Sequence, residues 1–226
     1  MKLAVIMVTH ARSEMFERAV RTLRAADGSF SLWVFAMDKP AIPDCSQDVA
    51  IDLYQRGMID HLILEEIAPN LHRTFRRGIE AAMAVTSPDA FLLTADDYEF
   101  KPTWYEHTVA VLSDDRFSHI TLDIEPPFPW NAIRKQENVN GVDVLIRDTV
   151  PGALWAMTLN GWRNMRTIFR NNELATMCDH HINSCMRAQN RLIGAIDEAE
   201  HVGAYLSTVA NNAYHKYHPV GAKVVL

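Results

Sequence analysis

Two adjacent carboxylates, Asp96 and Asp97, follow closely after a short apolar run at residues 91–93. Such a run predicts a strand that is buried on both faces of a parallel sheet. The carboxyl end of a strand of this kind is where open α/β sheets bind their ligands. Two carboxylates at that place repel each other and lose hydration, and a divalent cation carrying a diphosphate would offset both costs. The alternative is a solvated Asp-Asp turn that caps the next helix.

The chain before this acidic pair alternates between strand and helix patterns. Residues 3–8 form a continuous aliphatic run, which predicts a central strand. From Ser13, apolar residues recur every three or four positions, which predicts an amphipathic helix. Residues 31–36 predict a second strand that closes on Asp38, so the chain opens with a βαβ unit. Further elements are expected in this half: a short helix at 49–56, a strand at 60–64 and a helix at 70–84.

The chain after the acidic pair is less regular. Proline and glycine become frequent between residues 125 and 152. Helices are expected at 102–112, at 159–169 and within 173–191, and strands at 118–124, 142–147, 153–158 and 193–196. The whole pattern predicts one α/β domain with a mixed, mostly parallel sheet flanked by helices.

Length, composition and net charge narrow the class of protein to which this chain can belong. The 226 residues are 48% hydrophobic and 22% charged, which is ordinary for a globular protein with a proper core. The net charge of −6 argues weakly against a dedicated nucleic-acid binder. Three cysteines without a CxxC predict reduced thiols, and no run is long enough to span a membrane, so we expect a cytoplasmic protein. The sequence contains neither a P-loop nor a GxGxxG motif, which leaves ATP and NAD chemistry with little support.

Seven features in a fixed order carry a resemblance to a known family. They are residues 5–12, Asp38, residues 70–82, Ala95-Asp96-Asp97 with Pro102 and Trp104, residues 150–152, Cys178-Asp179, and Glu200-His201-Val202-Gly203 with Ser207-Thr208. Together they resemble the nucleotide-sugar glycosyltransferases of the GT-A fold, particularly family two. The resemblance covers about residues 1–210 and implies a Rossmann-like GT-A domain over residues 1–226. It further implies a nucleotide-sugar-binding half at 1–100 and an acceptor-binding half at 101–226.

The resemblance assigns the donor site to the first half of the chain. It implies that Asp38, Thr9, His10 and Arg12 flank the nucleobase, and that Asp96 binds the ribose hydroxyls. Arg12 could equally make a structural ion pair. Arg73 and Arg77 are candidates for phosphate contacts, although charges on a helix usually form its solvated face.

The resemblance also implies a divalent cation, Mn²⁺ or Mg²⁺, that bridges the phosphates of a UDP-sugar. Asp97 is the expected ligand, with His201 as the second, and an imidazole ligand favours Mn²⁺. The alternative for His201 is a hydrogen-bonded, partly buried histidine. Ala95 stands where a complete Asp-x-Asp motif has its first acid, which leaves open whether the activity depends on a metal.

The acceptor side and the catalytic base come from the second half. The resemblance implies an inverting transfer with Asp179 as general base, and its alternative role is a carboxylate at a helix start. His180 is a rival base, and Gly152, Trp155 and His180 are expected on the acceptor side. Core packing is an alternative for Trp155.

The sequence is also compatible with other functions. A catalytically inactive nucleotide-sugar-binding protein is one, because Ala95 weakens the acidic motif. The acceptor hydroxyl could belong to a saccharide, a protein, a small molecule or a hydroxymethylated DNA base. A zinc hydrolase built on the late histidines has little support, because no HExxH spacing occurs.

Overall fold

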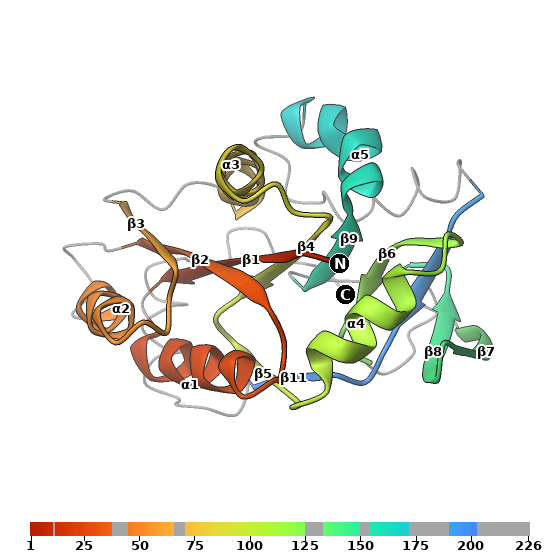
Figure 1. Ribbon diagram of the computed structural model, residues 1–226, viewed down its shortest axis with the longest axis horizontal. Helices are drawn as coiled ribbons and strands as arrows, with labels where there is room; N and C mark the ends of the chain where they lie inside the picture. The colour runs from red at the N-terminus through yellow and green to blue at the C-terminus, as the bar shows by residue number, and fades with distance from the viewer. Residues whose placement is uncertain are drawn as a thin grey trace, which may run out of the picture.

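The computed structural model describes residues 1–10, 12–37, 45–65, 71–124, 133–149, 154–171 and 190–202, without the side chains of 10, 37, 71, 72, 118 and 166–171. A nine-stranded sheet runs through these residues in the order β3-β2-β1-β4-β9-β6-β10-β8-β7 (Figure 1). A second sheet pairs only β11 and β5.

The first half of the chain builds one parallel side of the large sheet. Its elements are β1 (Leu3–His10), α1 (Ser13–Arg24), β2 (Phe30–Met37), α2 (Ser46–Gln55), β3 (His61–Glu65), α3 (Leu71–Val85) and β4 (Ala90–Ala95). Strands β3, β2, β1 and β4 are neighbours and all pair in parallel. Helices join them because a parallel pair needs a crossover connection. The strand and helix pattern predicted for this half is therefore present.

The second half extends the sheet with strands of both directions. Its elements are β5 (Tyr98–Phe100), α4 (Trp104–Leu112), β6 (Phe117–Thr121), β7 (Ile133–Val139), β8 (Val142–Arg147), β9 (Trp155–Thr158), α5 (Leu159–Asn171), β10 (Leu192–Ala195) and β11 (Ala199–His201). Strands β9 and β8 run against the other seven strands of the large sheet. The predicted fold class, a mixed and mostly parallel sheet, is confirmed.

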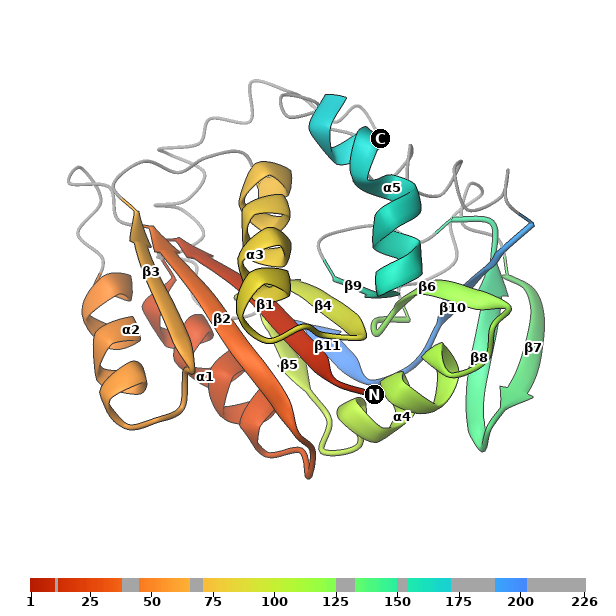
Figure 2. The same cartoon turned by 45° about the horizontal axis from the view of Figure 1, so that its top comes forward.

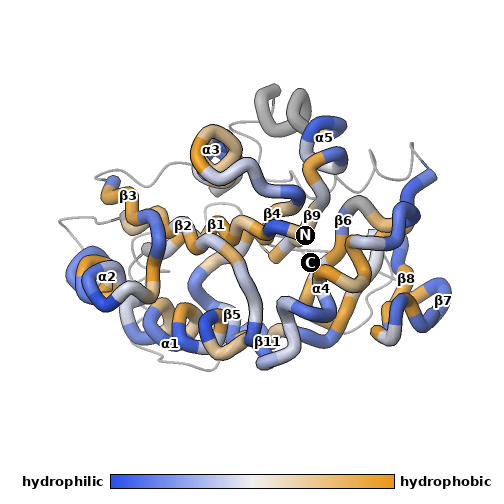
Figure 3. The backbone as a smooth tube through the Cα atoms, in the orientation of Figure 1, coloured by the Kyte–Doolittle hydropathy of each residue, from blue (hydrophilic) through white to orange (hydrophobic). Residues whose placement is uncertain are grey.

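Helices cover both faces of the sheet. Helices α1, α2 and α4 lie on one face and α3 and α5 on the other (Figures 1 and 2). Each face has its own apolar core, one centred on α1 with Phe16 and Leu23, the other on α3 with Phe75 and Ile79. Figure 3 shows the strands β1 and β2 as apolar, whereas much of α1 and α2 is polar on the side away from them. Helix α3 approaches β1 closely at Gly78, where a Cβ would lie 2.3 Å from Ile6 Cγ2.

Three strands were not predicted from the sequence. Strands β5 and β11 have three residues each, and β7 is almost entirely exposed and polar. The β7–β8 hairpin turns at Asn140-Gly141, both with positive φ (50° and 90°), which is the Asn-Gly signal of a tight hairpin. The helix predicted within 173–191 falls outside the described residues. In the part of the chain that the structure describes, no helix is long and apolar enough to cross a membrane.

Candidate functional site

The acidic pair stands at the carboxyl end of β4, in the middle of the large sheet between β1 and β9. After Ala95 the chain turns through Asp96 and Asp97 and enters β5. Asp96 is 1% exposed, and the Asp97 side chain is 13% exposed. Carboxylates withdrawn from water to this degree need partners in the protein or in a ligand.

The partners of Asp96 come from β1. The parallel register pairs Val8 with Ala95, so the next residue, Thr9, lies beside Asp96. The Thr9 hydroxyl donates a 2.7 Å hydrogen bond to Asp96 Oδ2, and Arg12 Nη1 lies 3.5 Å from Asp96 Oδ1. Thr9 is fully buried. Its observed role is therefore to support Asp96, and its expected place at a nucleobase stays a prediction.

The partners of Asp97 are Arg12 and His201. Arg12 Nη1 donates a hydrogen bond to Asp97 Oδ2, and His201 Nε2 lies 3.2 Å from the same oxygen. Of the two roles that the sequence left open for Arg12, the ion pair is the one present in this structure. The structure thus brings together an acid and a histidine that are 104 positions apart, as expected for a shared site.

The small two-stranded sheet of β5 and β11 positions His201 beside Asp97. β11 pairs antiparallel with β5, so that His201 stands opposite Tyr98, and their ring centroids are 5.1 Å apart. The next backbone N–H, that of Val202, donates to the Asp97 carbonyl at 2.9 Å. Backbone pairing on both sides of His201 fixes the segment, while the histidine side chain itself remains 44% exposed. The imidazole therefore stays accessible to a ligand.

The charges around Asp97 keep it ionised. Burial alone would raise its pKa, but the hydrogen bond from His201 and the positive charge of Arg12 outweigh burial and lower the pKa from 3.8 to about 2. Asp97 therefore remains a carboxylate across the physiological range. A permanent negative charge at this place is what a cationic ligand requires.

The donor atoms at the site fit a divalent cation. Asp97 Oδ1 is a buried atom without a hydrogen-bond partner among the described residues, so it retains the capacity to bind a ligand. Carboxylate oxygen together with imidazole nitrogen is a donor set that suits Mn²⁺. No group of three or more His, Cys, Asp or Glu gathers around one point within the described ranges. A cation held here would thus depend on phosphate oxygens and water for its other ligands.

A buried carboxylate that the sequence analysis missed holds the segment leading to β11. Glu198 is 5% exposed and lies three residues before His201. Its Oε2 accepts a 2.7 Å hydrogen bond from the Thr103 hydroxyl, and its Oε1 lies 2.5 Å from His107 Nδ1. Its backbone carbonyl accepts from the Lys101 N–H at 2.9 Å. Glu198 therefore fastens the chain before His201 to the start of α4.

Two arginines expected near the phosphates do not reach the acidic pair. Arg77 makes an ion pair with Glu65, and its guanidinium lies 5.9 Å from the Phe35 ring centroid. Arg73 is exposed on α3. Among the described residues neither arginine contacts Asp96 or Asp97, so a phosphate role for either would require it to reach the ligand from α3.

Trp155, expected on the acceptor side, has its side chain completely buried in the core. It lies on β9 opposite Leu93 of β4, and its ring meets the His119 ring edge-on at 6.0 Å. The structure therefore shows core packing, the alternative that the sequence left open, and the tryptophan offers no exposed ring to an acceptor.

The remaining predicted site residues lie outside the described part of the chain. They are Asp38, Gly152, Asp179 and His180, together with the side chain of His10. Their proposed roles stay predictions.

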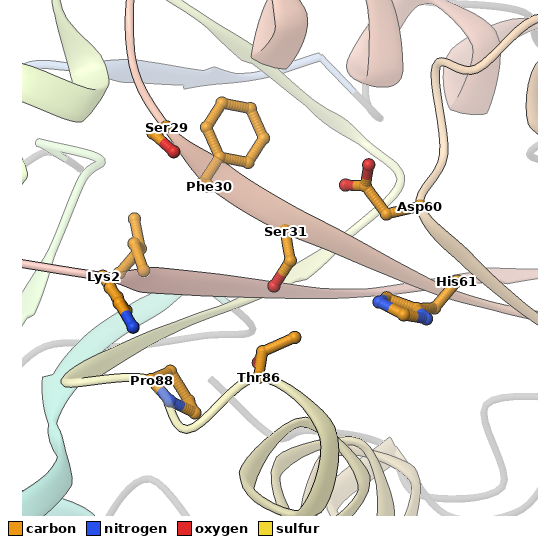
Figure 4. Close-up of a pocket in the computed structure, with 9 residues that line it drawn as sticks. Lys2, Ser29, Phe30, Ser31, Asp60, His61, Thr86 and Pro88 are labelled. Carbon is orange, nitrogen blue, oxygen red and sulfur yellow. The ribbon is translucent and has the colours of Figure 1, made fainter.

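A cavity of about 340 Å³ lies at the opposite edge of the sheet. It is formed at the amino ends of β1, β2 and β3 and at the turn before β4; Figure 4 shows Lys2, Ser31, His61, Thr86 and Pro88 around it. Its acid, Asp60, already pairs with Arg24 at 2.6 Å. Because ligands of open α/β sheets bind at the carboxyl ends of the strands, we place the candidate site at Asp97 and not here.

Comparison with known proteins identifies the fold. No protein-family model and no curated protein matches the sequence. Solved structures with the same fold include S. aureus TarS in complex with UDP-GlcNAc, at a TM-score of 0.60 and 12% identity over 92% of this chain. GalNAc-T7 with UDP, GalNAc and Mn²⁺ matches at 0.66 and 13% over 88% of the chain. The mannosyltransferase PcManGT from Pyrobaculum calidifontis, in complex with GDP-Man and Mn²⁺, matches at 0.56 and 13% over 95%.

The chain has the GT-A fold, which these nucleotide-sugar glycosyltransferases share. It spans less than two thirds of each of them: 62% of the TarS chain, 43% of GalNAc-T7 and 59% of the mannosyltransferase. At identities of 12–13% the likeness establishes the fold, and the activity has to be argued from the site.

Proposed function

We propose that this protein is a glycosyltransferase that moves a sugar from a nucleoside-diphosphate sugar to a hydroxyl acceptor, with a UDP-sugar as the favoured donor. The observation that carries this proposal is the meeting of Asp97, Arg12 and His201 at the carboxyl edge of a GT-A sheet. This is the edge at which open α/β sheets bind their ligands. Structurally similar proteins hold UDP-GlcNAc, UDP or GDP-Man, which supports a nucleotide-sugar donor.

The donor occupies the half formed by residues 1–100, and residues 101–226 form the acceptor half. Asp96 binds the ribose hydroxyls and is oriented by the Thr9 hydroxyl. Asp38 and His10 flank the nucleobase. Arg12, which the sequence resemblance placed beside the nucleobase, is instead proposed to contact the diphosphate, because its guanidinium already lies at Asp97 and 3.5 Å from Asp96 Oδ1. Guanidinium groups suit phosphates, which they bind with two parallel hydrogen bonds.

Asp97 and His201 would be the protein ligands of a divalent cation, and the imidazole ligand favours Mn²⁺ over Mg²⁺. A bound cation supplies positive charge against the diphosphate as that group leaves. The support is the buried Oδ1 atom of Asp97, the nitrogen–oxygen donor set and the Mn²⁺ present in two similar structures. The chain itself keeps Asp97 ionised, fixes His201 through β11 and leaves the imidazole accessible.

Sugar transfer proceeds with inversion, and Asp179 is the general base. The acceptor oxygen forms a bond to the anomeric carbon while the bond from that carbon to the diphosphate oxygen breaks. The acceptor proton passes to the Asp179 carboxylate, and the diphosphate leaves with the bonding electron pair. We expect Asp179→Asn to abolish transfer and to leave donor binding nearly unchanged, as measured by product assay and calorimetry; full activity would remove Asp179 from the reaction. His180→Gln tests the rival base in the same way.

One observation favours a second function, that of an inactive nucleotide-sugar-binding protein. Ala95 provides no carboxylate where a complete acidic motif has one. Slow hydrolysis of the donor in the absence of acceptor separates the two functions, because only an enzyme releases the nucleoside diphosphate.

The first experiment is a thermal-shift screen of UDP- and GDP-sugars with and without Mn²⁺. A ligand that binds only the folded protein raises its stability according to concentration and affinity, by about 2.7 kcal/mol at a hundred times Kd. We expect a UDP-sugar to raise Tm, and more so with Mn²⁺ than with EDTA. The same screen, extended with saccharides, peptides and hydroxymethylated DNA, addresses the acceptor.

A further inference from the structure

Arg12 supplies the positive charge closest to Asp97 among the described residues. The residue follows β1, and its backbone N–H donates to Ser46 Oγ at 3.2 Å, which anchors it between α1 and α2. From there its guanidinium contacts Asp97 Oδ2 and lies 3.5 Å from Asp96 Oδ1. The Arg12 side chain is only 13% exposed. The positive charge is thus held close to both acids and largely away from water.

The same oxygen of Asp97 serves both Arg12 and His201, whose Nε2 lies 3.2 Å from it. The other oxygen, Oδ1, is buried and has no hydrogen-bond partner in the described part of the chain. If a divalent cation binds Asp97 and His201, it stands beside the Arg12 guanidinium, which has the same sign of charge. In a poorly solvated site like charges repel strongly. The present Arg12 contact therefore opposes the cation.

We propose that Arg12 is an internal counter-cation, which neutralises the acidic pair in the free protein and transfers to the donor diphosphate when a divalent cation enters. The inference rests on the proposed function, and it adds that the divalent cation and the nucleoside diphosphate bind more tightly together than either does alone. The cation alone meets the opposition of Arg12, whereas the cation together with a nucleoside diphosphate gives Arg12 a new anionic partner. Metal and nucleotide consequently bind with positive coupling, and Arg12 carries much of that coupling.

Both states of Arg12 follow from the cost of burying charge. Without either Arg12 or a divalent cation, the Asp97 carboxylate would keep only His201 as a partner, and a poorly compensated carboxylate that is withdrawn from water is strongly destabilising. With a cation present, the guanidinium is surplus at Asp97 but matches the planar, bidentate geometry of a phosphate. A permanent structural ion pair is the competing interpretation, and it predicts that Arg12 stays at Asp97 in every state.

The test is a titration of Mn²⁺ followed by the electron paramagnetic resonance signal of the free ion, with and without saturating UDP. The variants are Arg12→Gln and Arg12→Met, which remove the charge and keep a long side chain. We expect each to bind Mn²⁺ alone about tenfold more tightly than the unmodified protein. In each variant, the factor by which saturating UDP increases the affinity for Mn²⁺ should fall by a similar amount. The factor by which Mn²⁺ increases the affinity for UDP should fall equally, because coupling between two ligands is reciprocal.

Arg18→Gln is the matched control. Arg18 lies on α1, the helix that begins directly after Arg12, and pairs with Glu99 of β5, so the variant removes an arginine–carboxylate ion pair outside the site. It should leave Mn²⁺ binding and its coupling to UDP unchanged.

The outcomes separate this inference from the proposed function. If the unmodified protein takes up neither Mn²⁺ nor UDP, the proposed function fails. If it binds both, but neither Arg12 variant binds Mn²⁺ alone more tightly, the inference alone is overturned. If the variants melt at a lower temperature, the inference predicts that Mn²⁺ restores their Tm, because the ion replaces the lost positive charge at Asp97. A Tm that Mn²⁺ does not raise shows a permanent structural ion pair and again overturns the inference.

Discussion

Asp97 and His119 are both ionisable side chains that are largely withdrawn from water, but their pKa values are shifted by different causes. Asp97 lies in the bend after β4, and its side chain is 13% exposed, whereas His119 is fully buried within β6. At Asp97 the hydrogen bond from His201 and the charge of Arg12 outweigh burial, so the pKa falls to about 2 and the group stays charged. At His119 burial acts without opposition and lowers the pKa to about 4, so the group stays neutral. Burial alone therefore does not distinguish the candidate ligand site from the core; the difference is that Asp97 has cationic and hydrogen-bonding partners that keep it charged.

The position of each group explains the difference. Asp97 lies at the carboxyl edge, where the ends of β1 and β11 bring an arginine and a histidine to it. His119 lies inside β6, between β9 and β10, with its ring against Trp155. Neither of its ring nitrogens has a hydrogen-bond partner among the described residues. At the carboxyl edge of the sheet, Arg12 and His201 stabilise the charged form of Asp97. Inside the sheet, the described residues offer His119 no such partner, so its imidazole is stable only in the neutral form.

Removing the charge at the edge should have the largest effect. Asp97→Asn keeps the shape but loses the carboxylate, so we expect kcat for donor turnover to fall by about 10³-fold, comparable to the loss of one preorganised transition-state contact. Release of nucleoside diphosphate from the nucleotide sugar measures this. Asp114→Asn, which changes an acid paired with Arg116 in the turn after α4, should leave kcat unchanged. Equal activity of both variants would contradict a catalytic role for the edge.

Removing the neutral group in the interior should change stability and its pH dependence. The pKa of His119 is lower in the folded protein (about 4) than its ordinary value of 6.5, so the unfolded chain takes up the proton first. Protonation therefore costs about 3 kcal/mol of stability as the pH falls from 7 to 4. In His119→Leu this share of the acid sensitivity should disappear, as measured by urea unfolding at several pH values. An unchanged pH slope would show that His119 titrates normally.

A smaller effect is expected where Glu198 positions His201. Glu198→Gln keeps the size of the side chain and removes the charge that faces Thr103 and His107. We expect the affinity for Mn²⁺ to fall about tenfold, as for other groups that orient a ligand, while Tm changes by only a few degrees. Calorimetry with Mn²⁺ plus UDP separates the two effects. A lower Tm with unchanged Mn²⁺ affinity would reduce Glu198 to a purely structural role.

Much of the fold was predictable because the parallel half is built from strongly periodic segments. The apolar runs of β1 and β4 and the helical spacing of α1 and α3 are visible in single windows of sequence. Strands β5 and β11 were missed because each has three residues and they pair across about a hundred positions. Strand β7 was missed although Asn140-Gly141 marked its hairpin, because its exposed polar residues gave no apolar alternation.

The candidate site was only partly visible in the sequence. Asp96 and Asp97 stood out because two acids follow a buried strand, but His201 was found through the family resemblance and not through spacing. The position of Arg12 at Asp97 depends on how the turn after β1 is folded, which the sequence left open between two roles. Glu198 was missed because its partners lie 91 and 95 positions earlier in the chain.

The most direct test of the proposed function is calorimetric titration of UDP- and GDP-sugars into the unmodified protein and into Asp97→Asn, each with Mn²⁺ and with EDTA. Uptake of a nucleotide sugar is the property that the proposed function requires. We expect uptake of one nucleotide sugar that is strongest with Mn²⁺, and loss of this Mn²⁺ dependence in Asp97→Asn. Binding of no uridine or guanosine nucleotide sugar under either condition would contradict the proposed function.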